Sequence, residues 1–147
     1  MPEFEYHHIV TFEETSVVGS VYYANHIRWQ GRCREIFLRQ HVPEILGLME
    51  QGLALVTLSV RCEFFHELAA FDALTIRMRL ADLAPHRMSL EFEYWREQDH
   101  GEELVARGGQ ELACMMRREG RGRSELEPEP WPKPMREALA PYLNRTG

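Results

Sequence analysis

The chain has 147 residues, of which 44% are hydrophobic and 27% are charged, and its formal net charge at pH 7 is −6. This length and composition are typical of one globular domain with a single core. The negative charge gives no general attraction to nucleic acid or to an anionic membrane, and no apolar run in the sequence approaches the ~20 residues of a membrane span. The acidic start of the chain, residues 1–5, lacks the features of a signal peptide, so we expect a cytoplasmic protein.

The cysteines and histidines form no pattern typical of a disulfide framework or a metal site. Cys33, Cys62 and Cys114 are odd in number and widely spaced, which favours reduced thiols in core positions. The seven histidines make neither an HxxxH nor an HExxH pattern. We therefore expect no metal and no cofactor.

The N-terminal part of the sequence predicts a strand, a loop and a long helix. The strand is expected at residues 6–12 and the polar, glycine-containing loop at 13–20. From Tyr22 to Val42 the apolar residues recur at steps of three, four and seven, which places them on one helix face. These residues are Tyr22, Trp29, Cys33, Ile36 and Phe37. Gly31 lies inside this helix, where glycine costs about 1 kcal/mol relative to alanine. We expect another element to approach the helix closely at Gly31.

The remainder of the sequence predicts mainly strands. A short amphipathic segment at 44–51 comes first. Apolar and polar residues then follow strand-like patterns at 54–65, 74–80 and 90–94, with Trp95 interrupting the alternation of the last of these. A turn at 98–101 leads to a final strand at 103–116, in which Gly108-Gly109 indicates a bulge or a close contact.

This order of elements predicts a two-layer α+β domain in which the last four strands run on as an antiparallel meander. One helix covers only one face of such a sheet, so another subunit should cover the other face or an edge strand. Residues 1–125 would form this domain. Residues 126–147 would form a Pro-rich tail. The extended, mobile stretch would begin before it, at 117, and run to 134, followed by a short helix at 135–143.

One stretch of the sequence resembles the active-site segment of a known enzyme family. Residues 12–26 read Phe-Glu-Glu-Thr-Ser-Val-Val-Gly-Ser-Val-Tyr-Tyr-Ala-Asn-His. Hot-dog-fold thioesterases of the 4-hydroxybenzoyl-CoA type have a similar segment, loosely aromatic-x-Asp-Thr-Asp-x-x-Gly-x-Val-Tyr-x-x-x-Tyr. Three further segments, 28–35, 67–72 and 112–115, are similar to the branch of this family that releases polyketide chains in enediyne biosynthesis. The resemblance implies an antiparallel sheet wrapped around one long central helix.

The resemblance also implies an activity and partners. The implied reaction is hydrolysis of a β-ketoacyl polyene thioester bound to the acyl carrier protein domain of an iterative polyketide synthase. The implied assembly is a homotetramer built as a dimer of dimers. Two alternatives stay open: a general acyl-CoA thioesterase, and a non-catalytic hot-dog protein that binds an acyl chain or product. The non-catalytic alternative is favoured by Ser16, because the family's usual catalytic Asp falls there, although the enediyne branch is similar in lacking that acid.

The expected catalytic residues lie in the loop and on the helix. Gly19, Ser20 and Val21 stand where the long helix begins, where unpaired N–H groups can stabilise an oxyanion. The alternative for these positions is a loop glycine and a capping serine. Ser16 would orient water or the thioester. Glu35 is a candidate general base.

The resemblance implies that Arg34 holds the polar head of the acyl group with two hydrogen bonds. The alternative for Arg34 is a surface contact with Glu35 or Gln30. The expected substrate-binding residues are Tyr22, Asn25, His26 and Gln30. His26 stands where the family usually has Tyr, and it could act as a base or simply pack in the core.

Two further expectations concern the surroundings of the site. Glu13 and Glu14 should face solvent or cap the loop. Apolar residues such as Phe64, Phe65 and Met116 could line an acyl tunnel, although such strand residues more often belong to the core.

Overall fold

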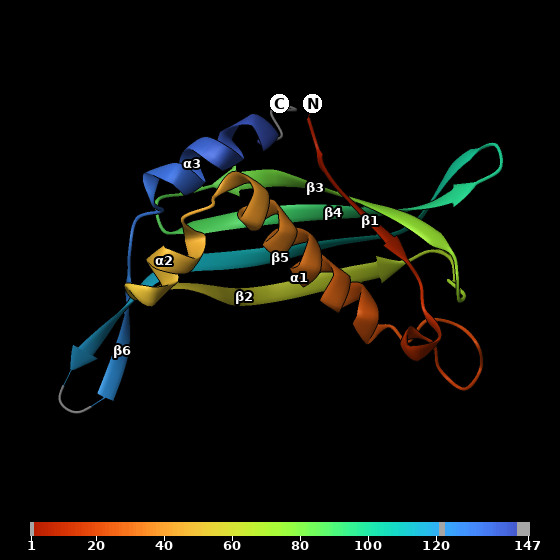
Figure 1. The fold of residues 1–147 in the computed structure, drawn as a ribbon, viewed down its shortest axis with the longest axis horizontal. Helices are drawn as coiled ribbons and strands as arrows, with labels where there is room; N and C mark the ends of the chain where they lie inside the picture. Colours follow the sequence, from red (N-terminus) through yellow and green to blue (C-terminus); the bar gives the residue numbers. More distant parts are fainter. Residues whose placement is uncertain (1, 121–122, 144–147) are drawn as a thin grey trace.

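The computed structural model describes residues 2–120 and 123–143 of the chain. In these residues, six strands form one antiparallel sheet in the order β1-β3-β4-β5-β2, and β6 pairs with β5. Figure 1 shows the long helix α1 crossing one face of this sheet. The predicted α+β hot-dog fold is therefore confirmed. No helix in the described part of the chain is long and apolar enough to span a membrane.

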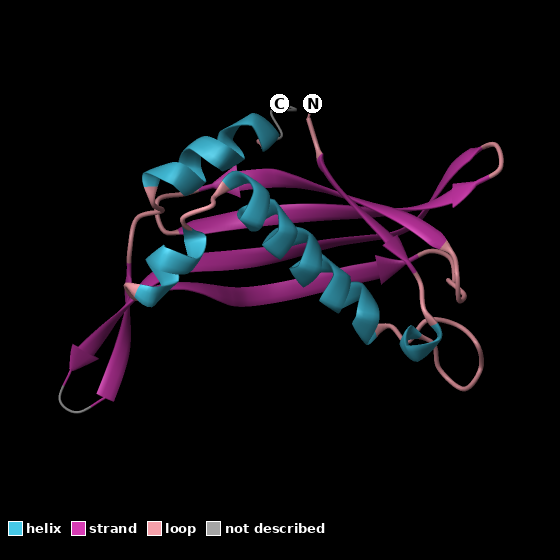
Figure 2. Cartoon of the chain, viewed as in Figure 1, coloured by secondary structure: helices cyan, strands magenta, loops and turns pink. Residues whose placement is uncertain are grey.

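The elements follow the predicted order, with shifted bounds. In chain order they are β1 (Phe4–Ile9), α1 (Ala24–His41), α2 (Ile45–Glu50), β2 (Leu53–Phe64), β3 (Ala73–Leu83), β4 (Arg87–Gln98), β5 (Gly101–Gly120), β6 (Arg123–Pro128) and α3 (Lys133–Leu139). Single turns of 3-10 helix lie at Phe12–Glu14 and Ala140–Tyr142. Figure 2 shows the helices gathered in front of the sheet in the same view.

The predicted meander is correct for β3, β4 and β5 and wrong for β2. Strand β1 pairs along one edge of β3, so that edge is occupied. Strand β2 pairs instead with β5, from Leu53 opposite Met116 to Phe64 opposite Ala106. The chain therefore crosses the sheet between β2 and β3, and β2 stands at an edge of the described sheet.

Helix α1 forms the centre of the core through the predicted apolar face. Trp29, Cys33 and Phe37 are almost completely buried. Phe37 meets Phe4 of β1 edge to face, with ring centroids 5.3 Å apart. Burying one such side chain stabilises the fold by about 1.5–3 kcal/mol. Tyr22 departs from the prediction, because it precedes the helix and is exposed.

One glycine of α1 and two glycines of β5 differ in whether a Cβ atom would fit at their positions. A Cβ on Gly31 would meet no atom within 4 Å, so the expected close approach at this position is wrong. A Cβ on Gly108 would lie 2.7 Å from the backbone oxygen of Arg61 and would collide with the amide of Gln30. A Cβ on Gly109 would collide with the guanidinium of Arg61. The register stays unbroken at these two residues, so they form a close contact and not a bulge.

Strand β4 keeps its alternation through Trp95. Tyr94 is buried, whereas Trp95 lies half-buried on the other face, with the guanidinium carbon of Arg77 5.4 Å from the centre of its ring. The register shift between Tyr94 and Trp95 skips Val105 and so belongs to β5.

The C-terminal segment packs onto the core, so the expected free, extended tail is wrong for the described residues. Strand β5 continues to Gly120 and β6 folds back against it. Trp131, Met135 and Leu139 are buried, and the indole N–H of Trp131 donates to the backbone oxygen of Arg87 at 3.2 Å. The expected short helix at 135–143 is present as α3 and the 3-10 turn after it. Residues 144–147 of the expected tail lie outside the described residues.

Candidate active site

The loop before α1 folds back on itself. The N–H of Ser16 donates to the carbonyl oxygen of Ser20 at 2.8 Å, and the N–H of Gly19 donates to the carbonyl oxygen of Ser16 at 2.9 Å. Gly19 has a φ of +90°, which lies in the left-handed region that glycine adopts without steric cost. The N–H of Val21 donates to the carbonyl oxygen of Leu68 at 2.8 Å. The loop is thereby joined to the segment that follows β2.

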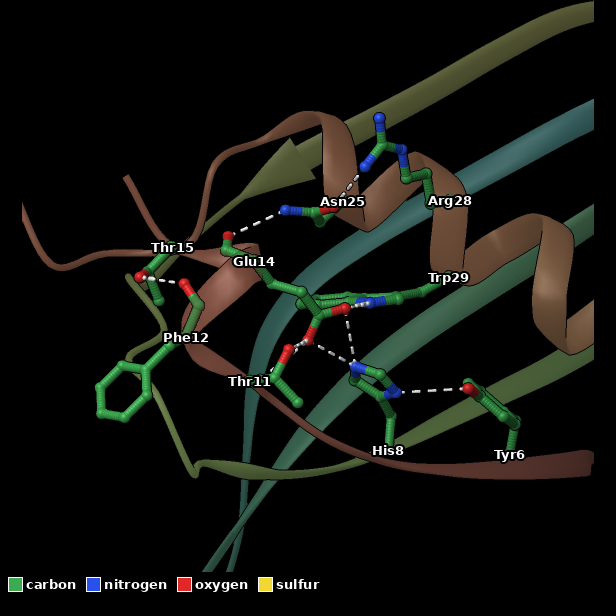
Figure 3. A network of polar contacts seen from close by, with 9 residues as sticks. All are labelled: Tyr6, His8, Thr11, Phe12, Glu14, Thr15, Asn25, Arg28 and Trp29. Atoms are coloured by element: carbon green, nitrogen blue, oxygen red, sulfur yellow. Dashed lines mark hydrogen bonds and ion pairs between the residues drawn. The ribbon is translucent and has the colours of Figure 1, made fainter. Parts of the chain in front are cut away.

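The carboxylate of Glu14 is buried beneath this loop, where it collects donors from three parts of the chain (Figure 3). It accepts hydrogen bonds from the indole N–H of Trp29 at 2.7 Å and from the backbone N–H of Thr11 at 2.9 Å. The Nε2 atom of His8 lies 2.9 Å away. Burial alone would raise the pKa of Glu14, but the hydrogen bonds from Thr11, Trp29 and His8 outweigh it and hold the pKa below its usual 4.5.

The backbone carbonyl of Glu14 is equally occupied. It accepts a hydrogen bond from the side-chain amide of Asn25 at 2.8 Å and another from the N–H of Tyr22 at 2.9 Å. The expectation that Glu14 caps the loop is confirmed, whereas exposure to solvent holds only for Glu13. The spacing Thr11-x-x-Glu14 is the capping-box pattern and was the available sequence signal.

The backbone donors predicted to form the oxyanion hole are mostly engaged within the chain. The N–H groups of Gly19 and Val21 already donate to carbonyl oxygens in the loop and its neighbour, and the N–H of Tyr22 donates to Glu14. Within the described residues, only Ser20 of the predicted set has a backbone N–H without an acceptor.

Two further donors lie at the start of α1. The N–H groups of Tyr23 and Ala24 have no acceptor among the described residues, as expected for the first turn of a helix. Tyr23 already has helical backbone angles, with φ −55° and ψ −29°. These N–H groups stand at the positive end of the helix dipole. Sequence reasoning placed the helix start one to two residues too early and so missed them.

A pocket of about 210 Å³ opens beside this helix start. Ser20, Val21, Tyr23 and His26 form one wall of it, and the segment 64–68 forms the other. Phe64 and Phe65 both belong to this second wall, where a tunnel was expected. Apolar and polar residues both line the pocket, and Tyr23, whose backbone N–H is unpaired among the described residues, is one of them.

His26 is the buried polar residue of the pocket wall. Its side chain is packed between the rings of Trp29, Phe64 and Tyr94, at centroid distances of 5.0, 4.7 and 5.5 Å. The Tyr94 hydroxyl donates to the backbone oxygen of His26 at 2.6 Å and so fixes α1 against β4. Neither ring nitrogen of His26 has a hydrogen-bond partner among the described residues.

Burial lowers the pKa of His26 from 6.5 to about 4, against the opposing effect of the nearby Tyr23 backbone. The imidazole is therefore neutral at pH 7. A neutral imidazole offers one donor and one acceptor.

Gln30 and Arg34 continue the line of polar side chains along α1. The amide of Gln30 donates to the backbone oxygen of Arg61 at 3.0 Å, and its own oxygen is buried without a partner among the described residues. The Nη1 of Arg34 donates to the side-chain oxygen of Gln110 at 2.8 Å, while its Nε has no described partner. Since residues four apart share a helix face, His26, Gln30 and Arg34 form an inward stripe about 12 Å long.

Arg34 therefore points toward the sheet and not toward the helix surface. It hydrogen-bonds Gln110 of β5, so the alternative of a surface contact with Glu35 or Gln30 does not hold. Burial lowers the pKa of Arg34, and the charge of Glu35 partly offsets this. Sequence reasoning missed Gln110, because its distance along the chain gives no local signal.

Other predicted site residues lie outside the pocket wall. Glu35 is exposed and lines a separate groove between α1 and α2. The side chain of Ser16 is half-buried and forms no hydrogen bond with the described residues. Asn25 holds the Glu14 carbonyl, and the ring of Tyr22 packs against Tyr23 at a centroid distance of 4.8 Å.

The described residues contain no group of three or more His, Cys, Asp or Glu side chains placed to hold a metal ion. Cys33 and Cys114 are buried, Cys62 is half-buried, and all three are free. Burial raises the pKa of the Cys62 and Cys114 thiols to about 11, so neither is a thiolate at neutral pH.

Comparison with known proteins decides the family. Residues 10–139 match the model of the thioesterase-like superfamily. The chain belongs to this superfamily. Among solved structures, the dynemicin thioesterase is 41% identical, with a TM-score of 0.90, over 97% of this chain and 99% of that one. That structure is described as revealing induced-fit and allosteric effects upon polyene binding. No curated protein matches the chain.

More distant relatives share the fold. A mutant of 4-hydroxybenzoyl CoA thioesterase in complex with 4-hydroxybenzoyl CoA is 18% identical, with a TM-score of 0.81, over 95% of this chain and 99% of that one. A 1,4-dihydroxy-2-naphthoyl-CoA thioesterase from Synechocystis is 20% identical, with a TM-score of 0.76, over 95% of this chain and 96% of that one. The resemblance read from the sequence is confirmed, and the chain is a thioester hydrolase.

Proposed function

We propose that this thioesterase releases a β-ketoacyl polyene chain from the acyl carrier protein domain of an iterative polyketide synthase in enediyne biosynthesis. The observation that carries the proposal is Arg34, whose guanidinium is turned inward onto Gln110 with Nε left unpaired among the described residues. An arginine in this setting can donate to a keto oxygen. The similarity to the dynemicin thioesterase supports the polyene part of the proposal.

The reaction needs an oxyanion site, a positioned water and room for the acyl chain. The N–H groups of Tyr23 and Ala24 are the donors for the thioester carbonyl oxygen, because both are unpaired among the described residues and Tyr23 lines the pocket. Water adds to the carbonyl carbon, the carbon–sulfur bond breaks, and the thiolate takes up a proton. No carboxylate stands at Ser16, so catalysis rests mainly on positioning and oxyanion binding, with Ser16 orienting water or the thioester. The β-keto acid released can then lose CO2 without further help.

The site is completed by a second copy of the chain. About 16 Å of helix separates the N–H of Tyr23 from Arg34 in one chain. The two carbonyl groups of a β-ketoacyl thioester are separated by a single carbon. One chain therefore cannot offer both groups to the same end of the substrate, and Arg34 would come from a neighbour. Exposed apolar side chains near the loop, Phe12, Val17, Val18 and Phe71, and the edge strand β2 support such a contact.

The assembly we propose is a homotetramer built as a dimer of dimers, with the carrier protein docking on its outside. Basic side chains near the site would steer an acidic carrier protein, but Arg77 and Arg79 are already paired with glutamates. Arg61 and Arg87 form no ion pair within the described residues, which leaves them for this contact.

The substrate test compares β-ketoacyl and saturated thioesters of equal length, each on coenzyme A and on an acyl carrier protein. We expect the wild type to prefer the β-keto chain and the carrier protein. Arg34→Ala should lose the β-keto preference, while Arg32→Ala, a matched change on the exposed side of α1, should keep it. Rates no higher than in buffer on all four substrates would overturn the proposed activity, and a preference for coenzyme A would overturn the carrier.

The shared site is tested by mixing two variants that are each impaired on the β-keto substrate. A hybrid of Tyr23→Pro and Arg34→Ala chains contains one site with both native groups if the site spans two chains. We expect β-keto turnover after dissociation and reassembly to exceed that of either variant alone. If the mixture is no faster than the separate variants, both groups act within one chain, and the shared arrangement is wrong.

A further inference from the structure

His26 has hydrogen-bonding capacity that no described residue of the protein uses. Its side chain is 4% exposed, it lines the pocket at the start of α1, and neither ring nitrogen has a described partner. A buried polar group left unpaired destabilises the folded protein. Phenylalanine would fill this aromatic cage of Trp29, Phe64 and Tyr94 without that cost. The imidazole is therefore available to a hydrogen-bonding group on a bound ligand.

The position of His26 indicates which part of a bound substrate would contact its ring. It stands one helical turn, about 5 Å, beyond the N–H of Tyr23 that we assign to the thioester carbonyl oxygen. Much of the wall around it is apolar, with Val21, Phe64, Phe65 and Leu68 forming a surface for hydrocarbon. A substituent on the acyl chain close to the thioester would thus face the ring of His26.

We propose that His26 hydrogen-bonds an oxygen on the β-carbon of the acyl group, two bonds from the thioester carbonyl carbon. This contact would select β-oxygenated acyl groups over plain hydrocarbon chains. This inference rests on the proposed thioesterase function and adds a specificity-determining residue to it. A keto oxygen has two lone pairs, so it can accept from the imidazole and from an arginine together. A β-hydroxyl can also bind His26, since the neutral ring offers an acceptor as well as a donor.

The size of the selectivity follows from the unpaired ring. A β-oxygenated chain pairs His26, whereas a saturated chain leaves it buried without a partner. A site that hydrogen-bonds a substrate group discriminates strongly against the analogue that lacks it. From one such contact we expect roughly 10-fold to 100-fold in kcat/KM.

The experiment measures kcat/KM for β-keto, β-hydroxy and saturated thioesters of equal length with three variants. His26→Phe should bring the three substrates within about 3-fold of one another, because the phenyl ring can neither donate nor accept a hydrogen bond. His26→Asn should retain part of the preference and covers the case in which the phenylalanine variant does not fold. His100→Phe is the matched control outside the pocket. His100 is exposed in the turn between β4 and β5, so this variant should keep the preference.

A second measurement does not depend on turnover. The nitrogen resonances of His26 are followed by NMR during titration with a non-hydrolysable β-ketoacyl amide and with the saturated amide. We expect a shift of the His26 ring nitrogens with the β-keto amide only, assigned by its absence in His26→Phe. Failure of the proposed function would appear as no hydrolysis of any thioester. Failure of this inference alone would appear as hydrolysis with the β-keto preference intact in His26→Phe and no ring shift.

Discussion

The indole N–H of Trp29, in the second turn of α1, donates a 2.7 Å hydrogen bond to the buried carboxylate of Glu14, in the loop before the helix. The same carboxylate binds the backbone N–H of Thr11 and lies against His8 of β1. Three segments are thereby held at one point (Figure 3). The direction in which α1 leaves the loop, and with it the position of the Tyr23 N–H, depends on this carboxylate.

Glu14→Gln should destabilise the protein by about 2–4 kcal/mol, because it removes a buried charge that accepts several hydrogen bonds and places an amide donor among donors. Urea unfolding measures the change. Glu13→Gln, an exposed neighbour in the same turn, should stay within about 0.5 kcal/mol of the wild type. A loss below about 1 kcal/mol in Glu14→Gln would show that the network contributes little.

The free energy of unfolding should decrease with falling pH in two separate pH ranges. The pKa of His26 is about 4 in the folded protein and 6.5 as its ordinary value, so the unfolded chain binds this proton first. Its contribution is complete above pH 6.5 and is lost as the pH falls toward 4, by about 3 kcal/mol. The titratable groups around it are Tyr23, His66 and Glu67 in the pocket wall and Tyr94 from β4.

The second window lies lower and belongs to Glu14. Its pKa in the folded protein is below the ordinary 4.5, so its contribution is complete above pH 4.5 and is lost as the pH falls further. Unfolding free energies measured across pH should lose the upper window in His26→Phe and the lower window in Glu14→Gln. An unchanged profile in either variant would assign that window to another group.

Gly108→Ala and Gly109→Ala form a matched pair with different expected costs. A methyl group at 108 meets the backbone oxygen of Arg61 at 2.7 Å, which cannot move without β2, and displaces Gln30. We expect a loss of about 1–3 kcal/mol and reduced activity. A methyl group at 109 meets only the end of the exposed Arg61 side chain, which can swing away, so the loss should be below about 1 kcal/mol. Thermal unfolding measures the two losses of stability. Equal losses would contradict the difference in packing between Gly108 and Gly109.

Tyr23→Pro tests the oxyanion donor directly. The φ of −55° at Tyr23 suits the proline ring, and the N–H that is lost has no partner among the described residues, so the fold should tolerate the change. Turnover should fall about 10²-fold to 10³-fold, because one donor to the developing oxyanion disappears. Tyr23→Ala keeps the N–H and serves as the control. Similar turnover of the two variants, with similar melting temperatures, would place the oxyanion elsewhere.

Local structure could be predicted well from the sequence, whereas contacts between distant segments could not. Periodicity identified the buried face of α1 through Trp29, Cys33 and Phe37. It could not indicate that β2 pairs with β5, because a strand's alternation is the same whichever neighbour it has. The packing of Trp131 was missed because the charged, Pro-rich residues around it suggested a free chain.

The candidate site shows the same division. The resemblance placed the loop and Arg34, but the partner Gln110 lies far away in the chain and left no pattern. Glu14 was assigned correctly as a cap, yet its burial arises only when His8 and Trp29 converge on it. The unpaired N–H of Tyr23 depends on where the helix begins, and helix ends are the least certain part of a sequence-based assignment.

The loop keeps its shape through backbone hydrogen bonds and the Glu14 carboxylate, while the side chain of Ser16 takes no part in it. The path of the loop and the role that we propose for the Ser16 side chain therefore depend on different groups. The side chain at position 16 can be exchanged without refolding the loop, so the stability of the fold and the chemistry proposed for this position can vary independently.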